Sequence, residues 1–271
     1  MRRSLRLRCH EVTLRTILHR QMQSIVAIGG GDLRTLATEP IDRAVIELSG
    51  CAAPNVLFVP TASSDSVEYW EAFDRAYRNV YGCRTDVLFL LGAVPPADRI
   101  AAKVRWADIV YVGGGNTLKM MRRWRRLGVD ALLRDAHAGG TVLCGVSAGA
   151  ICWFERGHSD SMSFYHPEAW SYIAVTGMGL LPGLACPHYD GHTAGVPRRD
   201  DFHAMLRKKG GPGLALDGLC AVAFVGDEYR VLSATRDAAA YTHSVRRGRV
   251  VERRLRAGPG YRPASELFRA E

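Results

Sequence analysis

The chain has 271 residues and a mass of 29.8 kDa, which is enough for one large α/β domain or two small ones. Its hydrophobic fraction of 47% and charged fraction of 23% are ordinary for a globular protein and exclude a disordered or collagen-like chain. No run of about 18 uncharged apolar residues occurs, so no segment is predicted to span a membrane.

The net charge of +9 is concentrated at the two ends of the chain. Residues 1–20 carry six arginines and one glutamate, and residues 245–271 carry eight arginines and three glutamates. Because the middle of the chain is close to neutral, we expect solvated basic ends and no nucleic-acid partner. We therefore predict a disordered N-terminal extension over 1–21, a single domain over 22–244 and a basic C-terminal tail over 245–271.

The seven cysteines are an odd number, are widely scattered and include no C-x-x-C pair. This usage is typical of free, buried thiols in a reducing compartment, so we expect a cytoplasmic protein. The spacing of the cysteines indicates no metal site, and the Arg-rich start lacks the apolar run of a secretory signal.

From Ser24 onward, apolar runs of strand length alternate with longer segments of helical periodicity, the pattern of β-α-β units in a mainly parallel sheet. The predicted strands are Ile25–Gly29, Val56–Pro60, Thr85–Leu91, Ile109–Val112 and Thr141–Gly145. The predicted helices are Pro40–Leu48, Ser66–Val80, Ala97–Val104 and Leu118–Ala138.

The pattern changes after Leu180. A helix predicted over Asp200–Lys208 is followed by four short β-rich runs: Leu214–Leu216, Ala221–Val225, Tyr229–Ser233 and Val250–Arg254. We expect these runs to be antiparallel edge strands, since no linker separates them from the rest. The predicted fold is α/β: a three-layer sandwich with a mainly parallel sheet flanked by helices and antiparallel edge strands near the C-terminus.

Three predicted strands end in glycine clusters, which should meet at the carboxyl edge of the sheet, where open α/β folds bind ligands. These clusters are Gly29–Gly31, Gly113–Gly115 and Gly145–Gly149. The third cluster, Gly145-Val146-Ser147-Ala148-Gly149, follows a buried strand and precedes a helix start. That context is typical of a G-x-S-x-G nucleophile elbow, in which the serine hydroxyl lies at a helix N-terminus. The alternative is that Ser147 only caps the helix.

A serine nucleophile needs a histidine base and a carboxylate that orients the base. His188 follows the apolar run Gly179–Ala185 and is the preferred base, with His192 as a second candidate. Asp160 and Asp217 both occupy turn positions that suit the acid, and either could instead be a turn former.

These motifs together resemble the dipeptidase E family of serine peptidases, which includes cyanophycinase and has a fold similar to that of class I glutamine amidotransferases. The matching segments span roughly residues 24–234 in family order: Ala27–Gly31, Phe58–Ala62, Val112–Thr117, Gly145–Ala150, Pro187–Tyr189 and Leu216–Gly218. The amidotransferases carry a cysteine at the elbow, so Ser147 argues against glutamine hydrolysis.

The resemblance implies that Ser147 is the nucleophile and His188 the general base. It further implies an oxyanion hole built by the backbone N–H groups of Gly114 or Gly115 and of Ala148, with Asn116 as a substrate-binding candidate. For the acid, the family pattern matches both Asp160 and Asp217; we favour Asp217 and keep Asp160. Relatives often have Glu at the second position, and an Asp there has a shorter reach. No metal and no organic cofactor are implied.

Dipeptidase E relatives favour peptides with an N-terminal aspartyl residue, whose carboxylate needs a cation. Arg198 and Arg199 are the candidates, and the alternative is that they form the exposed start of the following helix. The sequence thus predicts a cytoplasmic serine peptidase, monomeric or homodimeric, that acts on dipeptides or short peptides through an acyl-enzyme. Two alternatives are a non-peptide amidase or esterase with the same triad and an inactive ligand-binding relative.

Overall fold

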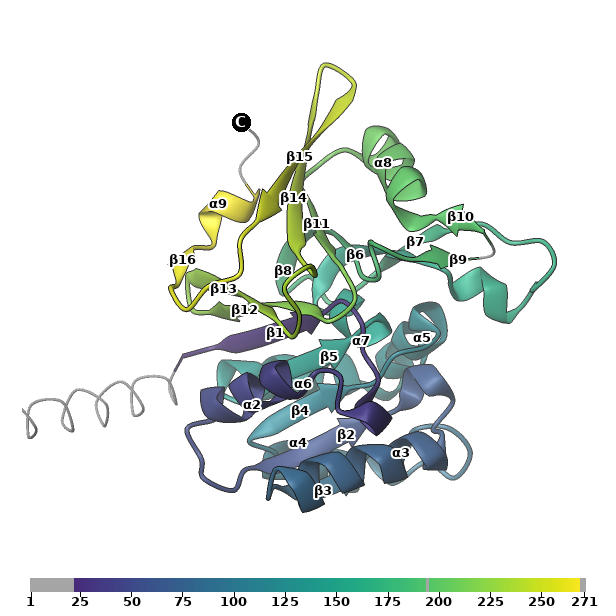
Figure 1. Ribbon diagram of the computed structural model, residues 1–271. Helices are drawn as coiled ribbons and strands as arrows, with labels where there is room; N and C mark the ends of the chain where they lie inside the picture. Colours follow the sequence, from purple (N-terminus) through teal and green to yellow (C-terminus); the bar gives the residue numbers. More distant parts are fainter. Residues whose placement is uncertain (1–21, 194, 269–271) are drawn as a thin grey trace, which may run out of the picture.

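The computed structural model of the chain describes residues 22–193 and 195–268. The extension predicted over 1–21 lies outside the described residues. None of the helices in the described ranges has the length and apolar character to cross a bilayer. The described helices and strands form two large sheets and one short two-stranded sheet, with helices around them (Figure 1).

The central sheet has eight strands, of which the five in its middle and at one end are parallel. In spatial order the strands are β16 (Arg262–Pro263), β13 (Glu228–Ser233), β12 (Cys220–Val225), β1 (Ser24–Ile28), β5 (Val142–Val146), β4 (Ile109–Val112), β2 (Asn55–Val59) and β3 (Arg84–Val87). The three strands beyond β1 come from the C-terminal part of the chain and are antiparallel. The predicted fold class is confirmed.

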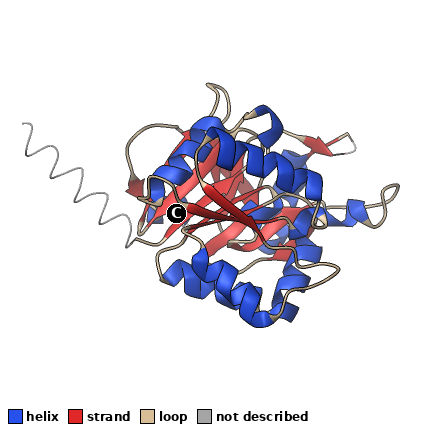
Figure 2. Ribbon diagram, turned by 90° about the horizontal axis from the view of Figure 1, so that it is seen from below, coloured by secondary structure: helices blue, strands red, loops and turns tan. Residues whose placement is uncertain are grey.

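Helices cover both faces of this sheet, as the view in Figure 2 shows. One face packs against α2 (Glu39–Leu48) and α3 (Val67–Asp74). The other packs against α4 (Ala97–Trp106), α5 (Thr117–Leu127) and α6 (Val129–Ala138). Because the middle strands are covered on both faces, β1, β4 and β5 are buried along their whole length.

Two predicted helices differ in detail from the observed ones. The run predicted as one helix over Leu118–Ala138 is two helices, because Gly128 adopts a left-handed conformation (φ 69°) and its N–H caps α5 on the Trp124 carbonyl. The helix predicted over Ser66–Val80 continues from α3 into a π-helical segment, Arg75–Val80.

The strand pattern of the sequence does not predict a second large sheet, which the structure contains. Its six strands, in spatial order, are β15 (Arg249–Leu255), β14 (Ala240–Arg246), β11 (Gly213–Leu216), β8 (Leu181–Cys186), β6 (Phe154–Ser159) and β7 (Ile173–Thr176). The predicted runs Leu214–Leu216 and Val250–Arg254 therefore belong to this sheet, as β11 and β15, and not to the edge of the central one. Helix α8 (Arg198–Lys209) packs against it through Phe202 and Leu206.

The basic residues from 245 onward contribute three elements, β15, β16 and α9 (Ser265–Phe268). Strand β15 pairs with β14 along its full length. Most of its residues are exposed or half-buried. An edge strand of this kind can carry arginines on its solvent face, which explains why its composition alone is typical of a tail.

Candidate active site

The carboxyl ends of β1, β4 and β5 lie side by side at one edge of the central sheet. The chain leaves β1 at Gly29, β4 at Gly113 and β5 at Ser147. The three glycine clusters singled out in the sequence therefore meet at the edge where open parallel sheets bind ligands.

Ser147 lies between β5 and the short helix α7 (Ala148–Ile151) with φ 57° and ψ −110°. A non-glycine residue in such a conformation costs about 1–3 kcal/mol and persists only where its surroundings enforce it. Two glycines allow the backbone to pack closely around this turn: a Cβ on Gly145 would come within 2.3 Å of the Gly149 carbonyl oxygen, and one on Gly149 within 2.2 Å of the Val112 carbonyl oxygen. The strand, turn and helix that a nucleophile elbow requires are all present.

His188 follows β8 and also has a positive φ, of 50°. Its N–H donates to the carbonyl of Gly29 at 3.1 Å, while the N–H of Ser147 donates to the carbonyl of Ile28 at 3.0 Å. The imidazole lies against Gly30, where a Cβ would be 2.5 Å from both Nδ1 and Cε1. Within residues 22–193 and 195–268, no hydrogen bond joins Ser147 Oγ to the imidazole.

Three charged residues in the described part of the chain act on His188. Burial lowers the pKa of His188 below its ordinary value, and the positive charge of Arg198 lowers it further. The carboxylates of Asp160 and Asp190 act in the opposite direction. The result favours a neutral imidazole near neutral pH, the form that can accept a proton. His192, the second candidate, lies on the exposed two-residue strand β9 (His192–Thr193).

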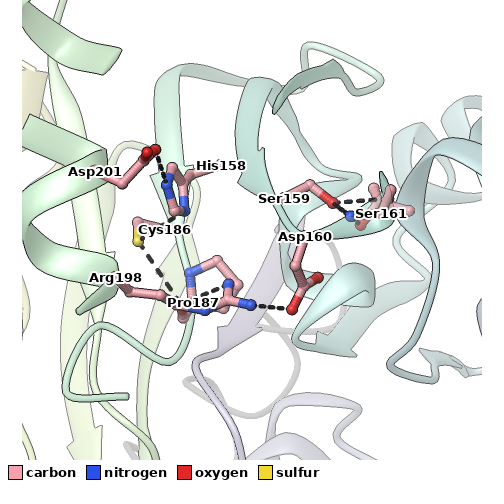
Figure 3. Close-up of polar contacts among 9 residues, drawn as sticks. His158, Ser159, Asp160, Ser161, Cys186, Pro187, Arg198 and Asp201 are labelled. Carbon is pink, nitrogen blue, oxygen red and sulfur yellow. Dashed lines mark hydrogen bonds and ion pairs between the residues drawn. The ribbon is translucent and has the colours of Figure 1, made fainter. Parts of the chain in front are cut away.

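Asp160 lies in the loop after β6 and forms an ion pair with Arg198 at the start of α8 (Figure 3). Arg198 is only 4% exposed, and its guanidinium also donates to the Pro187 carbonyl at 3.4 Å and lies over the ring of Tyr172. These contacts place the Asp160–Arg198 pair beside the chain segment that carries His188.

Asp217, the acid favoured from the sequence, is buried at the end of β11. Its Oδ2 accepts hydrogen bonds from the Ala239 N–H at 2.9 Å and from the Tyr241 hydroxyl at 3.2 Å. Burial raises its pKa, with a further rise from the charge of Asp190. Both described partners of this carboxylate lie at the start of β14, not on His188.

The other substrate-binding candidates have structural partners. Arg199 pairs with Glu252 Oε1 at 2.8 Å and is largely exposed. Asn116 is buried; its Oδ1 caps α5 by accepting the Lys119 N–H at 2.9 Å, and its Nδ2 donates to the Ser161 carbonyl at 3.3 Å. Asn116 therefore holds the loop next to Asp160 in place.

The backbone of Gly114 lies next to the serine. A Cβ on Gly114 would be 3.3 Å from Ser147 Cβ and 3.8 Å from its Oγ. Gly115 has φ +131°, and a Cβ there would meet the Ala62 carbonyl at 2.3 Å. Ala148 opens α7, so its N–H is one of the first-turn donors that a helix leaves without an intrahelical partner.

Two residues near the site carry no sequence signal. Tyr69 on α3 crosses the glycine loop: a Cβ on Gly113 would be 2.9 Å from Tyr69 Cε1. Burial raises the pKa of Tyr69 to about 12, although a hydrogen bond from the Gly114 backbone acts to lower it. The hydroxyl therefore keeps its proton. Asp190 accepts the Gly218 N–H at 2.8 Å and acts on His188. A tyrosine in an amphipathic helix and an aspartate in a turn are too common to be singled out.

The six cysteines that the structure describes are free, and five of them are buried. Cys144 in β5 and Cys152 after α7 flank the serine in sequence, but burial raises the pKa of each thiol well above its usual range. Neither thiol is suited to replace the Ser147 hydroxyl as a nucleophile.

The profile of peptidase family S51 matches residues 23–232, a range that contains Ser147, His188 and all the glycine clusters. This chain belongs to peptidase family S51. The family expected from the sequence motifs is confirmed, and with it the class of enzyme, a peptidase.

Two curated relatives cover most of this family S51 chain. The uncharacterized peptidase YgaJ of Bacillus subtilis (strain 168) is 35% identical over 226 residues, which cover 81% of this chain and 91% of the relative. A protein named peptidase E from Streptomyces coelicolor is 28% identical over 193 residues, which cover 69% of this chain and 74% of the relative.

Solved structures of two further proteins share the fold. A peptidase from an acI-B1 Actinobacterium superposes with a TM-score of 0.65 at 18% identity, covering 90% of this chain and 98% of that one. A putative peptidase E protein from Listeria monocytogenes EGD-e gives a TM-score of 0.59 at 20% identity, covering 78% of this chain and 98% of that one. At these identities the likeness concerns the fold alone.

Proposed function

We propose that this family S51 peptidase is a serine peptidase that hydrolyses dipeptides or short peptides, with Ser147 as nucleophile and His188 as general base. The observation that supports it most is the anchoring of both residues, through their own N–H groups, on the consecutive carbonyls of Ile28 and Gly29. Ser147 is in addition held in the strained backbone conformation of an elbow.

In the proposed reaction, Ser147 Oγ attacks the scissile carbonyl while His188 accepts the hydroxyl proton and then delivers it to the leaving amine. A water molecule, activated by the same imidazole, releases the acyl group. The N–H groups of Gly115 and Ala148 stabilise the negative oxygen of the tetrahedral intermediate, because the Gly114 N–H is directed to the Tyr69 hydroxyl. Substrate binding completes the bond between Ser147 and His188, because catalytic hydrogen bonds often tighten only in the complex.

Asp160 is the carboxylate that we propose to stabilise the protonated His188. Of the carboxylates acting on the imidazole, its charge raises the pKa most, whereas Asp217 is bonded to Ala239 and Tyr241. A negative charge that raises the pKa of a base also stabilises the cation formed when the base accepts a proton. Asp217 then has the role of fixing the start of β14.

The finer proposal concerns substrate preference and depends on Arg198. Its guanidinium is buried beside the His188 segment and pairs with Asp160 through Nη2, so a substrate carboxylate would bind its other N–H groups. Arg199, in contrast, is exposed and paired with Glu252. A buried guanidinium is the strongest protein partner for a carboxylate, because it offers several donors in one plane. We therefore propose a preference for an N-terminal aspartyl residue, tested by comparing Asp-Leu with Asn-Leu in wild type and Arg198→Lys.

The test of the main proposal is labelling of the purified protein with a fluorophosphonate probe, followed by a dipeptide library. Ser147→Ala and His188→Ala should both abolish labelling and hydrolysis, and Ser163→Ala, in the nearby turn after Asp160, should change neither. Folded wild-type protein that neither labels nor hydrolyses peptides would contradict the proposal and favour a ligand-binding relative. Hydrolysis of p-nitrophenyl esters but not of any peptide would instead indicate an esterase with the same triad.

A further inference from the structure

A second group of chemically active side chains lies outside the proposed catalytic centre, on the second sheet. His203 on α8, His243 on β14 and Glu252 on β15 direct one ligand atom each toward a common point, and these atoms all lie within 4.8 Å of one another. Glu252 Oε2 is 3.1 Å from His243 Nε2 and 3.4 Å from His203 Nε2.

The Tyr189 hydroxyl marks the point of convergence. It is 2.8 Å from His203 Nε2 and 3.0 Å from His243 Nε2, and it donates to Glu252 Oε2. In a tetrahedral zinc site the ligand atoms lie about 2.0–2.2 Å from the metal, and therefore roughly 3.3 Å from one another. The two separations of Glu252 Oε2 from the imidazole nitrogens match that spacing.

The framework that carries these residues is fixed by the fold. His243 and Glu252 face each other directly in the β14–β15 ladder, so the register of the hairpin places both side chains on one face. His203 lies on α8, which the neighbouring Phe202 and Leu206 pack against the same sheet. His243 is buried, whereas the side chains of His203 and Glu252 are each 19% exposed. An ion can therefore enter from solvent without unfolding the site.

The residue types agree with a borderline-soft divalent ion. Two imidazole nitrogens and one carboxylate oxygen form a set that Zn²⁺ binds, and the Tyr189 oxygen, which contacts all three, would be the fourth ligand or would be displaced by the ion. Glu252 Oε1 is held by Arg199, which leaves Oε2 for the metal and orients the carboxylate from outside. The positive charges of Arg199 and Arg207 act on His203 and oppose a cation, so removing Arg207, which does not orient Glu252, should tighten binding.

We propose that His203, His243 and Glu252 form a site for a divalent zinc-type ion. Such an ion would cross-link α8 to the β14–β15 hairpin. Because the ion binds only where α8 and the hairpin are folded against each other, it would raise the melting temperature. This site is separate from the peptidase chemistry, and its test does not depend on the proposed function.

The probe is Co²⁺, which takes the place of Zn²⁺ and reports its ligands through its absorption. The full chain, freed of metal with a chelator, should bind about one Co²⁺ with the visible bands of tetrahedral nitrogen and oxygen ligation and without a thiolate-to-cobalt band. Zn²⁺ should displace it. Loss of groups that only orient a metal ligand typically costs 10–100-fold in affinity, so Glu252→Gln and His203→Gln should each cost about a hundredfold or more.

Two further variants keep the proposal open to refutation. His166→Gln removes an exposed histidine elsewhere and should leave Co²⁺ affinity unchanged, while Arg207→Gln should increase it by removing a positive charge that acts on His203. If metal-free Glu252→Gln has the same melting temperature as metal-free wild type, its lower affinity for Co²⁺ does not come from a loss of folding. No saturable Co²⁺ binding, a thiolate band, or equal affinity in wild type, Glu252→Gln and His203→Gln would each overturn the proposal.

Discussion

Ser147 and His188 are 41 residues apart in sequence, yet their N–H groups donate to consecutive carbonyls, those of Ile28 and Gly29, at the end of β1. Neither residue reaches this position through its side chain, so the pair is aligned by the central strand and not by a bond between the two. Both adopt positive φ. This shared anchor makes the chain after β1 as important for the proposed chemistry as the two residues themselves.

The first prediction concerns Gly30. In Gly30→Ala the new Cβ would lie 2.5 Å from Nδ1 and Cε1 of His188, so the imidazole must move while the backbone around it stays. We expect peptidase activity to fall by at least about a hundredfold, as catalytic misplacement of about 1 Å does, with little change in the melting temperature. Steady-state kinetics and thermal denaturation of the same preparation check this.

The matched control is Gly139→Ala, at the C-terminal end of α6. Its Cβ would lie no closer than 3.4 Å to any neighbour, and its φ of −80° is open to alanine. This variant should keep full activity. A Gly30→Ala enzyme as active as Gly139→Ala would show that the observed position of the imidazole does not matter for catalysis.

The second prediction is the pH dependence of His188. Its pKa should lie below the ordinary 6.5 because of burial and Arg198. Asp160 and Asp190 raise that pKa, so Asp160→Asn should lower it further, whereas Arg198→Gln should raise it. The measurement is NMR titration of the histidine Cε1–H signals, assigned with His188→Gln, and the acid limb of kcat/KM should follow the same order.

Asp217→Asn provides the comparison for this titration, because the charges acting on His188 are those of Arg198, Asp160 and Asp190. It should leave the titration of His188 unchanged. If Asp217→Asn shifts the pKa of His188 and Asp160→Asn does not, the orienting acid is Asp217, as the sequence motif favours.

Much of the fold is readable from the sequence because the strands of the central sheet are short, apolar and regularly spaced. The segment Ile109–Val112, for example, is a strand with those bounds, since both of its faces are buried. The second sheet is harder to predict. Strand β6 contains Glu155, Arg156 and His158, whose polarity hides a strand that pairs with β8.

The candidate site also has a part that the sequence predicts and a part that it does not. Ser147 and His188 come from local motifs, and the fold brings their backbones together. The choice between Asp160 and Asp217 depends on contacts across 38 and 22 residues, with Arg198 and Ala239 respectively. No local pattern encodes such contacts. The same holds for His203, His243 and Glu252, which lack any metal-ligand spacing in sequence and meet only through α8 and a hairpin register.

The third prediction tests the structural role of Asp217. In Asp217→Ala the buried N–H of Ala239 loses its acceptor, which should lower the free energy of unfolding by about 1–3 kcal/mol. Catalytic efficiency should stay within about tenfold of wild type, since a folded active site remains. Urea denaturation and dipeptide kinetics measure the two effects. A loss of activity as large as in Ser147→Ala, with unchanged stability, would identify Asp217 as catalytic instead.

The fourth prediction concerns Tyr69, whose hydroxyl is hydrogen-bonded by the Gly114 backbone next to Ser147. Tyr69→Phe keeps the ring that packs on Gly113 and Phe58 but removes this acceptor. Without this hydrogen bond the loop at Gly114 should be held less firmly beside Ser147. We therefore expect kcat to fall about 3- to 30-fold with KM nearly unchanged. Tyr81→Phe, at the residue that follows the π-helical segment after α3, is the control and should have wild-type kinetics. Equal kcat in wild type and Tyr69→Phe would exclude this positioning role.

The fifth prediction is a pH dependence of stability that arises from Asp42, a fully buried residue on α2. Its carboxylate accepts hydrogen bonds from Thr38 and Tyr77, but burial outweighs them and raises its pKa from 3.8 to about 6. In this pH range the folded state binds the Asp42 proton more tightly than the unfolded state. The contribution of Asp42 to stability is therefore complete below 3.8 and is lost as the pH rises toward 6.

Asp42→Asn removes this titration and keeps a side chain of the same shape that can bond to both neighbours. The free energy of unfolding of wild type relative to Asp42→Asn should fall by about 2 kcal/mol between about pH 4.5 and about pH 7, at 1.36 kcal/mol per pKa unit. Urea denaturation of both proteins in reducing buffer measures the difference, in which all other titrating groups cancel. A difference that is independent of pH, or that grows in favour of wild type as the pH rises, would show that Asp42 is already ionised without cost in the folded state.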